Sequence, residues 1–412
     1  MVKAGYKQTE VGVIPEDWDV EELQAIASLE RGKFTARPRN DPKFFGGDIP
    51  FIQTGDVTGA SGWITTYSQT LNKEGLKVSK LFPKDTLFFT IAANIGDVAF
   101  STFDTACPDS LVAITAKLVN KRWLAYELSS RKSIFESLAT QNAQLNINLE
   151  KLRPYQIPMP PTKAEQQAIA GALSDVDGLI GSVEKLIAKK RSIKTGTMQQ
   201  LLTGKQRLPG FSGEWGLKKI SEFTDGTSGG TPSTTISAYW GGDIRWMSSG
   251  ELHLKFVADV EARITEEGLQ NSSTKPIPPN CVLIGLAGQG KTRGTVAINM
   301  VELCTNQSIA AIYPNDSFCP LYLYYNLDNR YEELRGLSTG DGGRGGLNLT
   351  ILRNIEIPFP NPDEQQAIAT VLSDMDAEIQ TLETKLAKTK AIKQGMMSEL
   401  LTGKTRLVAH SN

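Results

Sequence analysis

Apolar residues recur along two long segments at alternating steps of four and three residues. The first run begins at Ile169 and ends at Ile187, and the second begins at Ile368 and ends at Leu386. A sustained spacing of about 3.5 residues is the period of a coiled-coil seam. The predicted interface comprises Ile169, Leu173, Val176, Ile180, Val183, Ile187, Ile368, Leu372, Met375, Ile379, Leu382 and Leu386. One such helix alone would expose its seam, so we expect the two helices to bury their seams on each other.

The two helical segments belong to a longer internal repeat. The stretch from EQQAIA to LLTGKQRL (165–208) returns as EQQAIA to LLTGKTRL (364–407), with 25 identities in 44 aligned positions. A repeat at about half the chain length is a tandem duplication of a whole unit, because solenoid repeats have periods of ~20–50 residues. Gly204 and Gly403 follow the apolar pattern and predict the two helix ends.

The segments between the helices predict two similar globular domains. Short β-rich runs such as DTLFFTI and SLVAIT lie among Gly, Asn, Asp and Pro, and one helix per half is predicted near 121–140 and near 320–337. Fainter echoes keep the same order in both halves, such as GGDIPFIQTGDV with GGDIRWMSSGEL. We therefore predict an α+β fold. Its parts are a first domain at 1–160, a helical region at 161–205, a second domain at 206–359, a helical region at 360–408 and a tail at 409–412.

The composition argues against a metal site, a membrane protein and a protein that coats nucleic acid nonspecifically. The chain has 412 residues, a formal net charge of −1, four cysteines without CxxC spacing and two histidines, His253 and His410. These residues predict no metal site and suggest buried, reduced thiols. Neither a signal peptide nor a membrane-length apolar run is recognisable, so we expect a cytoplasmic protein with no membrane association. Balanced charge argues against nonspecific coating of nucleic acid but permits a local basic face.

One segment matches a nucleotide-binding motif by letter. Residues 285–292, GLAGQGKT, fit the P-loop pattern and follow the strand-like CVLI. A P-loop requires a helix next, because the helix N-terminus and the loop amides hold the phosphates. The following RGTVAINM is strand-like instead, and the first half lacks the motif. We interpret the segment as a β-hairpin loop, and keep a P-loop NTPase with a coiled-coil arm as the alternative function.

Basic and polar loops supply the candidate contacts to DNA. The run RGKFTARPRN (31–40) carries four basic residues and no acid, which suits phosphate contact, although a solvated loop is an equal alternative. Gln, Ser and Thr after each GGDI could reach base edges. The glycine-rich 338–348 follows a helix and is not a dinucleotide fingerprint. The candidates are Arg31, Lys33, Arg37, Arg39, Gln53, Thr54, Thr58, Asn94, Gln144, Ser248, Ser249, Lys291, Arg293 and Arg344.

No catalytic group is recognisable in the sequence. The two histidines, the unclustered cysteines and the scattered carboxylates show no spacing typical of an acid–base pair or of a nucleophile with its base. A role without catalysis is therefore favoured, and we predict no catalytic residue. A coiled-coil adaptor that binds only protein is a third hypothesis, which predicts no sequence-dependent DNA binding.

The arrangement resembles the specificity subunit of type I restriction–modification systems across the whole chain. The resemblance rests on the opening YKQTEVGVIPEDWDV, on the two GGDI segments, on NLEKLR…IPMPP and NLTILR…IPFP, and on EQQAIA…LLTGK occurring twice. It implies two target recognition domains that each read one half of an interrupted, asymmetric site on double-stranded DNA. It also implies that the two helices pack antiparallel as a spacer.

The resemblance further implies partners that carry the chemistry. Two methyltransferase subunits would dock on the helices, bringing S-adenosylmethionine, and restriction subunits would join for cleavage with ATP and Mg²⁺, so that this chain itself holds no cofactor. Helices of about 38 residues are roughly 55 Å long, and half-sites one DNA turn apart are separated by ~34–36 Å. We therefore expect helix length to set the gap between the half-sites.

Overall fold

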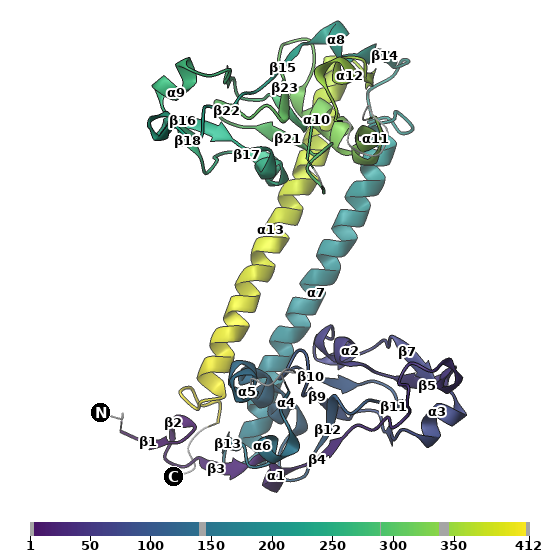
Figure 1. Ribbon diagram of the computed structural model, residues 1–412, viewed down its shortest axis with the longest axis vertical. Coiled ribbons are helices and arrows are strands. Elements are labelled where there is room, and N and C mark those ends of the chain that lie inside the picture. Colours follow the sequence, from purple (N-terminus) through teal and green to yellow (C-terminus); the bar gives the residue numbers. More distant parts are fainter. Residues whose placement is uncertain (1–3, 140–145, 289, 338–345, 409–412) are drawn as a thin grey trace. The chain divides into compact units, whose positions relative to one another are not determined.

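The structure is a computed structural model that describes residues 4–139, 146–288, 290–337 and 346–408 (Figure 1). The chain divides into two compact units. Unit 1 combines Met1–Glu184 with Lys385–Asn412, and unit 2 is Lys185–Thr384. Each unit therefore contains one globular domain and a part of both long helices. This repeated α+β architecture confirms the predicted fold class.

The globular domain of unit 1 contains a five-stranded and a four-stranded sheet, in the orders β4-β12-β9-β10-β6 and β7-β5-β11-β8. Two short pairs, β1-β2 and β13-β3, lie outside these sheets. The strands are β1 (Tyr6–Thr9), β2 (Gly12–Pro15), β3 (Asp19–Glu22), β4 (Ala27–Arg31), β5 (Phe45–Phe51), β6 (Trp63–Ile64), β7 (Gln69–Leu71), β8 (Leu81–Phe82), β9 (Leu87–Thr90), β10 (Val98–Ser101), β11 (Thr105–Ala106), β12 (Leu111–Ala116) and β13 (Gln156–Met159). The helices are α1 (Leu23–Ile26), α2 (Thr54–Thr58), α3 (Lys73–Lys77), α4 (Lys121–Ser130), α5 (Lys132–Leu138) and α6 (Leu149–Leu152).

The globular domain of unit 2 repeats this topology, with the orders β15-β23-β20-β21-β17, β18-β16-β22-β19 and β14-β24. The strands are β14 (Gly216–Lys219), β15 (Gly226–Ser228), β16 (Trp240–Met247), β17 (Phe256–Val257), β18 (Arg263–Ile264), β19 (Pro276–Ile277), β20 (Val282–Gly285), β21 (Val296–Asn299), β22 (Leu303–Thr305), β23 (Ile309–Ile312) and β24 (Glu356–Phe359). The helices are α8 (Ile220–Phe223), α9 (Glu266–Gln270), α10 (Pro320–Asp328), α11 (Tyr331–Gly336) and α12 (Leu349–Arg353), with the 3-10 helix η3 at Ser249–Leu254.

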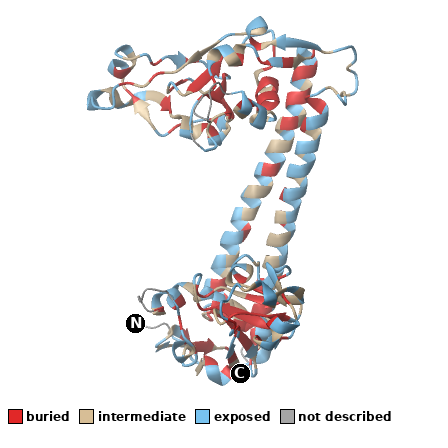
Figure 2. Cartoon of the chain, turned by 45° about the vertical axis from the view of Figure 1, so that its right-hand side comes forward, coloured by how far each residue is buried: buried red, intermediate tan, exposed pale blue. Residues whose placement is uncertain are grey.

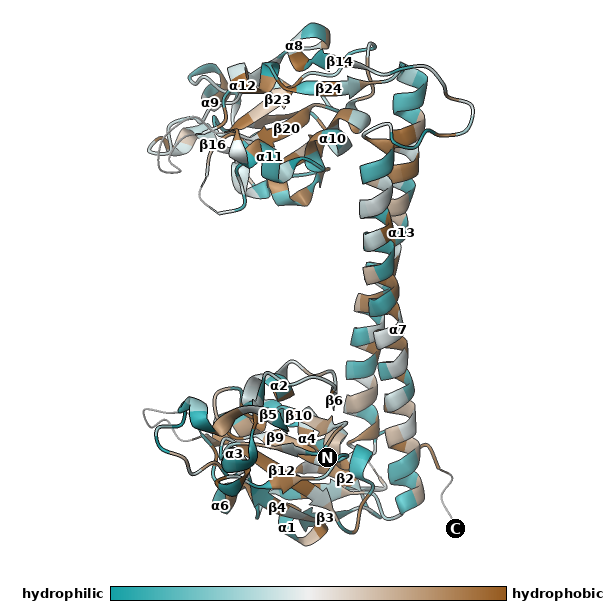
Figure 3. Ribbon diagram, turned by 90° about the vertical axis from the view of Figure 1, so that its right-hand side faces the viewer, coloured by the Kyte–Doolittle hydropathy of each residue, from teal (hydrophilic) through white to brown (hydrophobic). Residues whose placement is uncertain are grey.

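The core of each domain lies on the central strands of its five-stranded sheet. All four residues of β9 and all four of β20 are buried, as are most of their neighbours on the adjoining strands (Figure 2). The same strands carry the most hydrophobic residues of each domain (Figure 3). Fully apolar short runs are typical of strands covered on both faces, which explains why these segments are legible in the sequence.

The single helix predicted in each half is wrong in detail, because each is broken into two. Helix α4 ends and α5 begins on either side of Arg131, whose φ and ψ are −104° and 15°. The equivalent break between α10 and α11 includes Arg330, at −108° and 26°. Both arginines have left the helical region for the bridge region. Their side chains bind acids near the break: Arg131 binds buried Glu127, and Arg330 binds Glu333.

The two long helices are α7 (Lys163–Leu201) and α13 (Pro362–Leu400). Within each unit they run antiparallel, as the ion pairs show. In unit 1, Asp177 pairs with Lys393 and Glu184 with Lys390, both at 2.7 Å, so the numbering rises on one helix as it falls on the other. In unit 2 the pairs are Lys190–Glu378, Arg191–Glu383 and Lys194–Asp376.

Each of the twelve seam residues is buried or half-buried. The seam is not uniform, however. Its first two positions on α7, Ile169 and Leu173, belong to the core of the unit 1 domain together with Met397 and Leu400 of α13. Ile368 and Leu372 of α13 occupy the equivalent place in unit 2. The start of each long helix is therefore part of a domain core as well as of the helix pair.

The glutamate of EQQ and the arginine that follows LLTGK, both present in each copy of the repeat, form an ion pair at the end of each helix pair. Glu165, at the start of α7, is 1% exposed and binds Arg406 through both carboxylate oxygens. Arg406 also binds Asp17, at 2.9 and 3.0 Å. In unit 2, Glu364 is fully buried and binds Arg207 at 2.5 and 2.6 Å. We call these two bidentate pairs the Glu–Arg clamps.

The residue after each clamp glutamate holds the domain to its helix. The side-chain oxygen of Gln166 accepts a hydrogen bond from the backbone N–H of Asn120, the N-cap of α4, at 2.8 Å. Gln365 accepts one from the backbone N–H of Cys319, the N-cap of α10, at 2.9 Å. The repeated EQQ thus joins a long helix to its partner helix and to its own domain.

A second repeated contact lies further along each helix. The Tyr126 hydroxyl of α4 donates to Asp177 of α7 at 2.7 Å, and Lys393 of α13 binds the same carboxylate. Its ammonium also lies 5.5 Å from the Tyr126 ring. The equivalent residues in unit 2 are Tyr325, Asp376 and Lys194. These Tyr–Asp–Lys triads connect each domain to both long helices.

We predict that Glu165→Gln destabilises unit 1 by about 2 kcal/mol, because it removes the buried carboxylate from the Arg406 guanidinium, which keeps its pairing with Asp17. Urea unfolding followed by circular dichroism measures the change. Asp175→Asn is the matched control, since it removes the same charge from an exposed position of α7 that forms no ion pair among the described residues. Equal stability of the two variants would contradict a structural role for the clamp.

Candidate nucleic-acid interface

The polar candidates of the first domain gather around the short helix α2. Gln53 is its N-cap, and the backbone N–H of Gln53 donates to the Asp56 carboxylate at 2.7 Å. The Gln53 amide donates to the Gln69 side chain at 3.1 Å. The Thr54 hydroxyl donates to Ser110 at 3.2 Å, at the start of β12. Hydrogen-bonding groups from three segments therefore lie at one end of this domain.

The β9–β10 hairpin loop adjoins the other end of α2. Asn94 is exposed in this loop, and its amide donates to the Thr58 hydroxyl at 3.4 Å. Thr58 in turn donates to Asp97 at 2.8 Å, and Lys132 of α5 pairs with the same aspartate at 2.5 Å. The hairpin is thus held against two helices, so Asn94 is presented on a fixed base.

The basic run is partly neutralised by Asp109. The Arg39 guanidinium pairs with the Asp109 carboxylate at 2.8 Å, and the Arg31 side chain donates to the Asp109 backbone carbonyl at 2.6 Å. Partial burial acts to raise the pKa of Asp109, but the hydrogen bond from Arg39 and the nearby positive charges outweigh it and lower that pKa. Lys33 and Arg37 are exposed and form no ion pair within the described ranges. Their charges are therefore available to a partner, unlike that of Arg39.

The second domain presents different side chains on equivalent backbone. Ser248 begins η3 with the same type of capping box as Gln53, since its backbone N–H donates to Glu251 at 2.8 Å, and Ser249 follows it. The position of Lys33, whose backbone N–H bonds to Cys107, is taken in unit 2 by Gly230, which bonds to Thr305. The cationic run of the first domain therefore has no counterpart at this place in the second.

The P-loop look-alike is a hairpin loop. Strands β20 and β21 flank it and pair antiparallel, with Val282 opposite Ile298. This confirms the hairpin interpretation, because the helix that a P-loop needs does not follow. The backbone carbonyl of Lys291 accepts from the Tyr331 hydroxyl at 3.1 Å, which leaves the exposed Lys291 side chain on a supported turn. Arg293 is half-buried in the same loop.

Two candidates, Gln144 and Arg344, lie outside the described residues. Several polar residues were missed by sequence reasoning, including Gln69, Ser110, Asp97 and the hydrogen-bonded pair Thr231–Gln307, at 2.6 Å. Ser110 and Gln307 lie in the echoing segments DSLVAI and QSIAAI. That echo could have identified them, whereas nothing local distinguishes Gln69.

The described part of the chain offers neither a metal site nor a reactive thiol. No group of three or more His, Cys, Asp or Glu residues within it could hold a metal ion. The four cysteines are free and buried, as expected, and burial raises the pKa of Cys304 to about 11. None of its helices combines the length and apolarity of a membrane span. His253 bonds to the Gly250 carbonyl at 2.7 Å, and His410 lies outside the described residues.

A family model, described as the type I restriction modification DNA specificity domain, matches residues 15–189 and again residues 212–391. The chain belongs to this family. Specificity subunits are the non-catalytic DNA-recognition subunits of type I restriction–modification systems. The resemblance found in the sequence is thereby confirmed, and the P-loop NTPase alternative has no support.

Known relatives agree in extent and in fold. The chain is 27% identical to the putative type I restriction enzyme MjaX specificity subunit of Methanocaldococcus jannaschii, over 98% of this chain and 97% of that one. It is 36% identical to the MjaIX specificity subunit of the same organism, over 40% of this chain and 38% of that one. The crystal structure of a type I S subunit from M. genitalium has a TM-score of 0.62 at 16% identity, covering 93% of this chain and 96% of that one.

We predict that Asp109→Asn strengthens binding of this specificity subunit to duplex DNA and steepens its salt dependence. The change removes an anion beside the predicted phosphate contacts and releases Arg39, so the slope of log K against log salt should grow by roughly 1. Anisotropy titrations over a salt series measure both effects. Asp19→Asn, an exposed residue of β3, is the charge-matched control. An unchanged slope would show that the basic run does not contact the DNA.

Proposed function

We propose that this specificity subunit recognises an interrupted, asymmetric DNA site, with the domain at 1–160 reading one half and the domain at 206–359 reading the other. The observation that supports this most directly is that the two domains share one backbone topology but carry different side chains at equivalent positions. Gln53 and Ser248 begin equivalent turns, and Lys33 is replaced by Gly230. A glutamine can bond bidentately to adenine, while a serine is more permissive, so the two domains would read different sequences.

We further propose that two methyltransferase subunits dock on the long helices and that restriction subunits join for cleavage. The helices carry exposed apolar residues outside the seam: Leu186 and Ile193 on α7 are 38% and 43% exposed, and Ile392 on α13 is 49% exposed. Apolar residues at a heptad spacing outside a satisfied seam favour further helix packing. S-adenosylmethionine, ATP and Mg²⁺ would be bound by these cytoplasmic partners, and this chain would hold none of them.

The test is co-expression of the chain with its cognate methyltransferase subunit, followed by genome-wide mapping of methylated adenines. We expect one motif of two unlike half-sites separated by a fixed gap. Substitution of Gln53 by Ala should relax one half-site only, and substitution of Ser248 by Ala the other only. Methylation that follows no bipartite motif would contradict the proposal, and the adaptor hypothesis predicts that outcome.

The same mapping tests whether the helices set the gap. Helices α7 and α13 each contain residues of both units without interruption. Inserting one heptad into each helix preserves the seam and adds about 10 Å, which corresponds to roughly three base pairs. We expect the half-sites to be retained and the gap to lengthen. A lengthened chain that methylates the original motif would show that the gap has another origin.

A further inference from the structure

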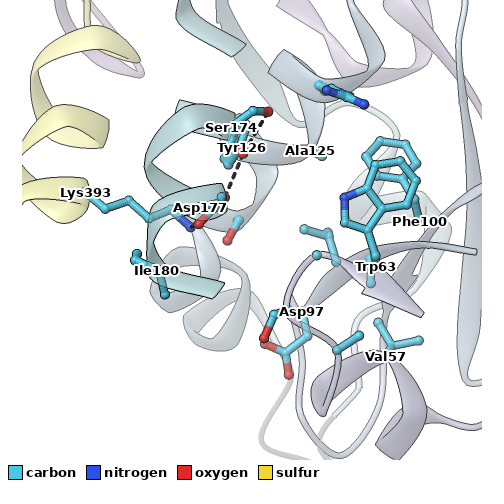
Figure 4. Close-up of a pocket in the computed structure, with 18 of the residues that line it drawn as sticks. Val57, Trp63, Asp97, Phe100, Ala125, Tyr126, Ser174, Asp177, Ile180 and Lys393 are labelled. Carbon is cyan, nitrogen blue, oxygen red and sulfur yellow. Dashed lines mark hydrogen bonds and ion pairs between the residues drawn. The ribbon is translucent and has the colours of Figure 1, made fainter. Parts of the chain in front are cut away.

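Unit 1 contains a cleft of about 660 Å³ between its globular domain and its long helices. One wall carries the Trp63 and Phe100 rings, 5.2 Å apart, and the opposite wall carries Tyr126, Asp177 and Lys393 (Figure 4). Trp63 is 37% exposed. Cavities of this volume accommodate a small ligand or an inserted side chain. We call this opening the unit 1 cleft.

The repeat shows what fills the same place in unit 2. Trp63 pairs with Phe100 across β6 and β10 as Phe256 pairs with Ile298 across β17 and β21. The backbone carbonyls of Gly62 and Lys255 accept the equivalent hydrogen bonds in these pairs. The wall of the unit 1 cleft and its counterpart can therefore be compared residue by residue.

A tyrosine occupies the space in unit 2. The Tyr–Asp–Lys triads align Tyr126 with Tyr325, so Ala125 aligns with Tyr324. Tyr324 is 2% exposed, and its ring lies 5.2 Å from the Phe256 ring. Ala125, with no ring, lines the unit 1 cleft.

Two further positions of the cleft carry an ion pair in unit 2. Lys255 pairs with Asp328 at 2.6 Å. Their counterparts are Gly62 and Ser129, and both line the unit 1 cleft. Three small residues in unit 1 thus replace the tyrosine, the lysine and the aspartate of unit 2, and together they open the cleft.

Most charges around the unit 1 cleft are paired within the structure. Among the described lining residues the exception is Arg122, whose guanidinium lies 5.6 Å from the Trp63 ring. Asp177 pairs with Lys393 and Glu184 with Lys390. Asp97 pairs with Lys132. A free phosphate would meet these carboxylates, whereas a neutral aromatic ring can pack against the ring wall, as Tyr324 packs at a tilt of 56° against Phe256 in unit 2. The chemistry of the cleft therefore suits an aromatic side chain rather than DNA.

We propose that the unit 1 cleft receives an aromatic side chain of one methyltransferase subunit, a proposal that rests on the proposed function. A protein partner is favoured because the helical wall of the cleft continues into exposed apolar residues. Leu179 adjoins the cleft residues Gly178 and Ile180 on α7, and Ile392 adjoins Lys393 on α13. A partner that covers these residues would also cover the cleft mouth. The two methyltransferase subunits would then dock unequally, because unit 2 supplies its own tyrosine.

Two variants close the cleft in different ways. Ala125→Tyr restores the ring of unit 2, and the double variant Gly62→Lys with Ser129→Asp restores its ion pair. A Cβ at Gly62 meets nothing within 4 Å, so the double variant has room for its side chain. The φ of +81° there strains a lysine, a strain that Lys255 already bears at +62° in unit 2. Ser130→Tyr, on the same helix but outside the cleft, is the matched control.

Calorimetric titration of the full-length chain with its purified methyltransferase subunit provides the measurement. We expect the wild type and Ser130→Tyr to bind two copies, and both cleft variants to retain one copy while binding the other about tenfold or more weakly, as for a lost aromatic anchor. Two copies bound at wild-type affinity by the double variant would overturn the proposal, even if Ala125→Tyr misfolds. A wild type that binds no methyltransferase contradicts the proposed function itself, and the cleft proposal with it.

Discussion

The bidentate ion pair between a buried glutamate and an arginine distant in sequence is the constraint on which each unit depends. Glu165 and Arg406 are 241 residues apart in the sequence, and the second globular domain lies between them. Glu364 and Arg207 form the same contact in unit 2. A buried carboxylate with its arginine removed would retain an uncompensated charge. The antiparallel register of the helices is therefore tied to charge as well as to the seam. Shifting one helix by a turn would break a clamp.

The clamp, the glutamine beside it and the Tyr–Asp–Lys triad explain why the helical repeat is so much better matched than the domains. Each contact joins separate elements of the fold, so losing one of its side chains leaves a polar group without its partner. The domain loops face no such requirement. Their sheets are fixed by buried central strands, and an exposed loop residue such as Lys33 needs no partner in the fold. One scaffold can thus present two different readers.

Much of this architecture could be predicted from the sequence. Heptad spacing, glycine at the helix ends and an ordered repeat indicated the helices and the two domains, and the strand after GLAGQGKT indicated a hairpin. The helix breaks at Arg131 and Arg330 could not be predicted, because neither segment has a proline or glycine at the break. The basic run at 31–40 contains no acidic residue, so its charge is unopposed within the run. In the fold, Asp109, which is distant in sequence, pairs with Arg39. The unit 1 cleft could not be predicted either, because Ala125 indicates a cleft only when it is compared with Tyr324 at the equivalent position of unit 2.

The central claim is that two domains with different DNA contacts are held by equivalent helix contacts. Its most direct test is a chain in which the second globular domain is replaced by a copy of the first, with both long helices and both Glu–Arg clamps retained. Under the proposed function, two identical readers would bind the DNA in opposite orientations. Mapping of adenine methylation by this chain with its methyltransferase subunit should therefore yield a palindromic motif, in which the half-site of the first domain appears twice in inverted orientation. Methylation of the original asymmetric motif, or of a direct repeat, would contradict the account.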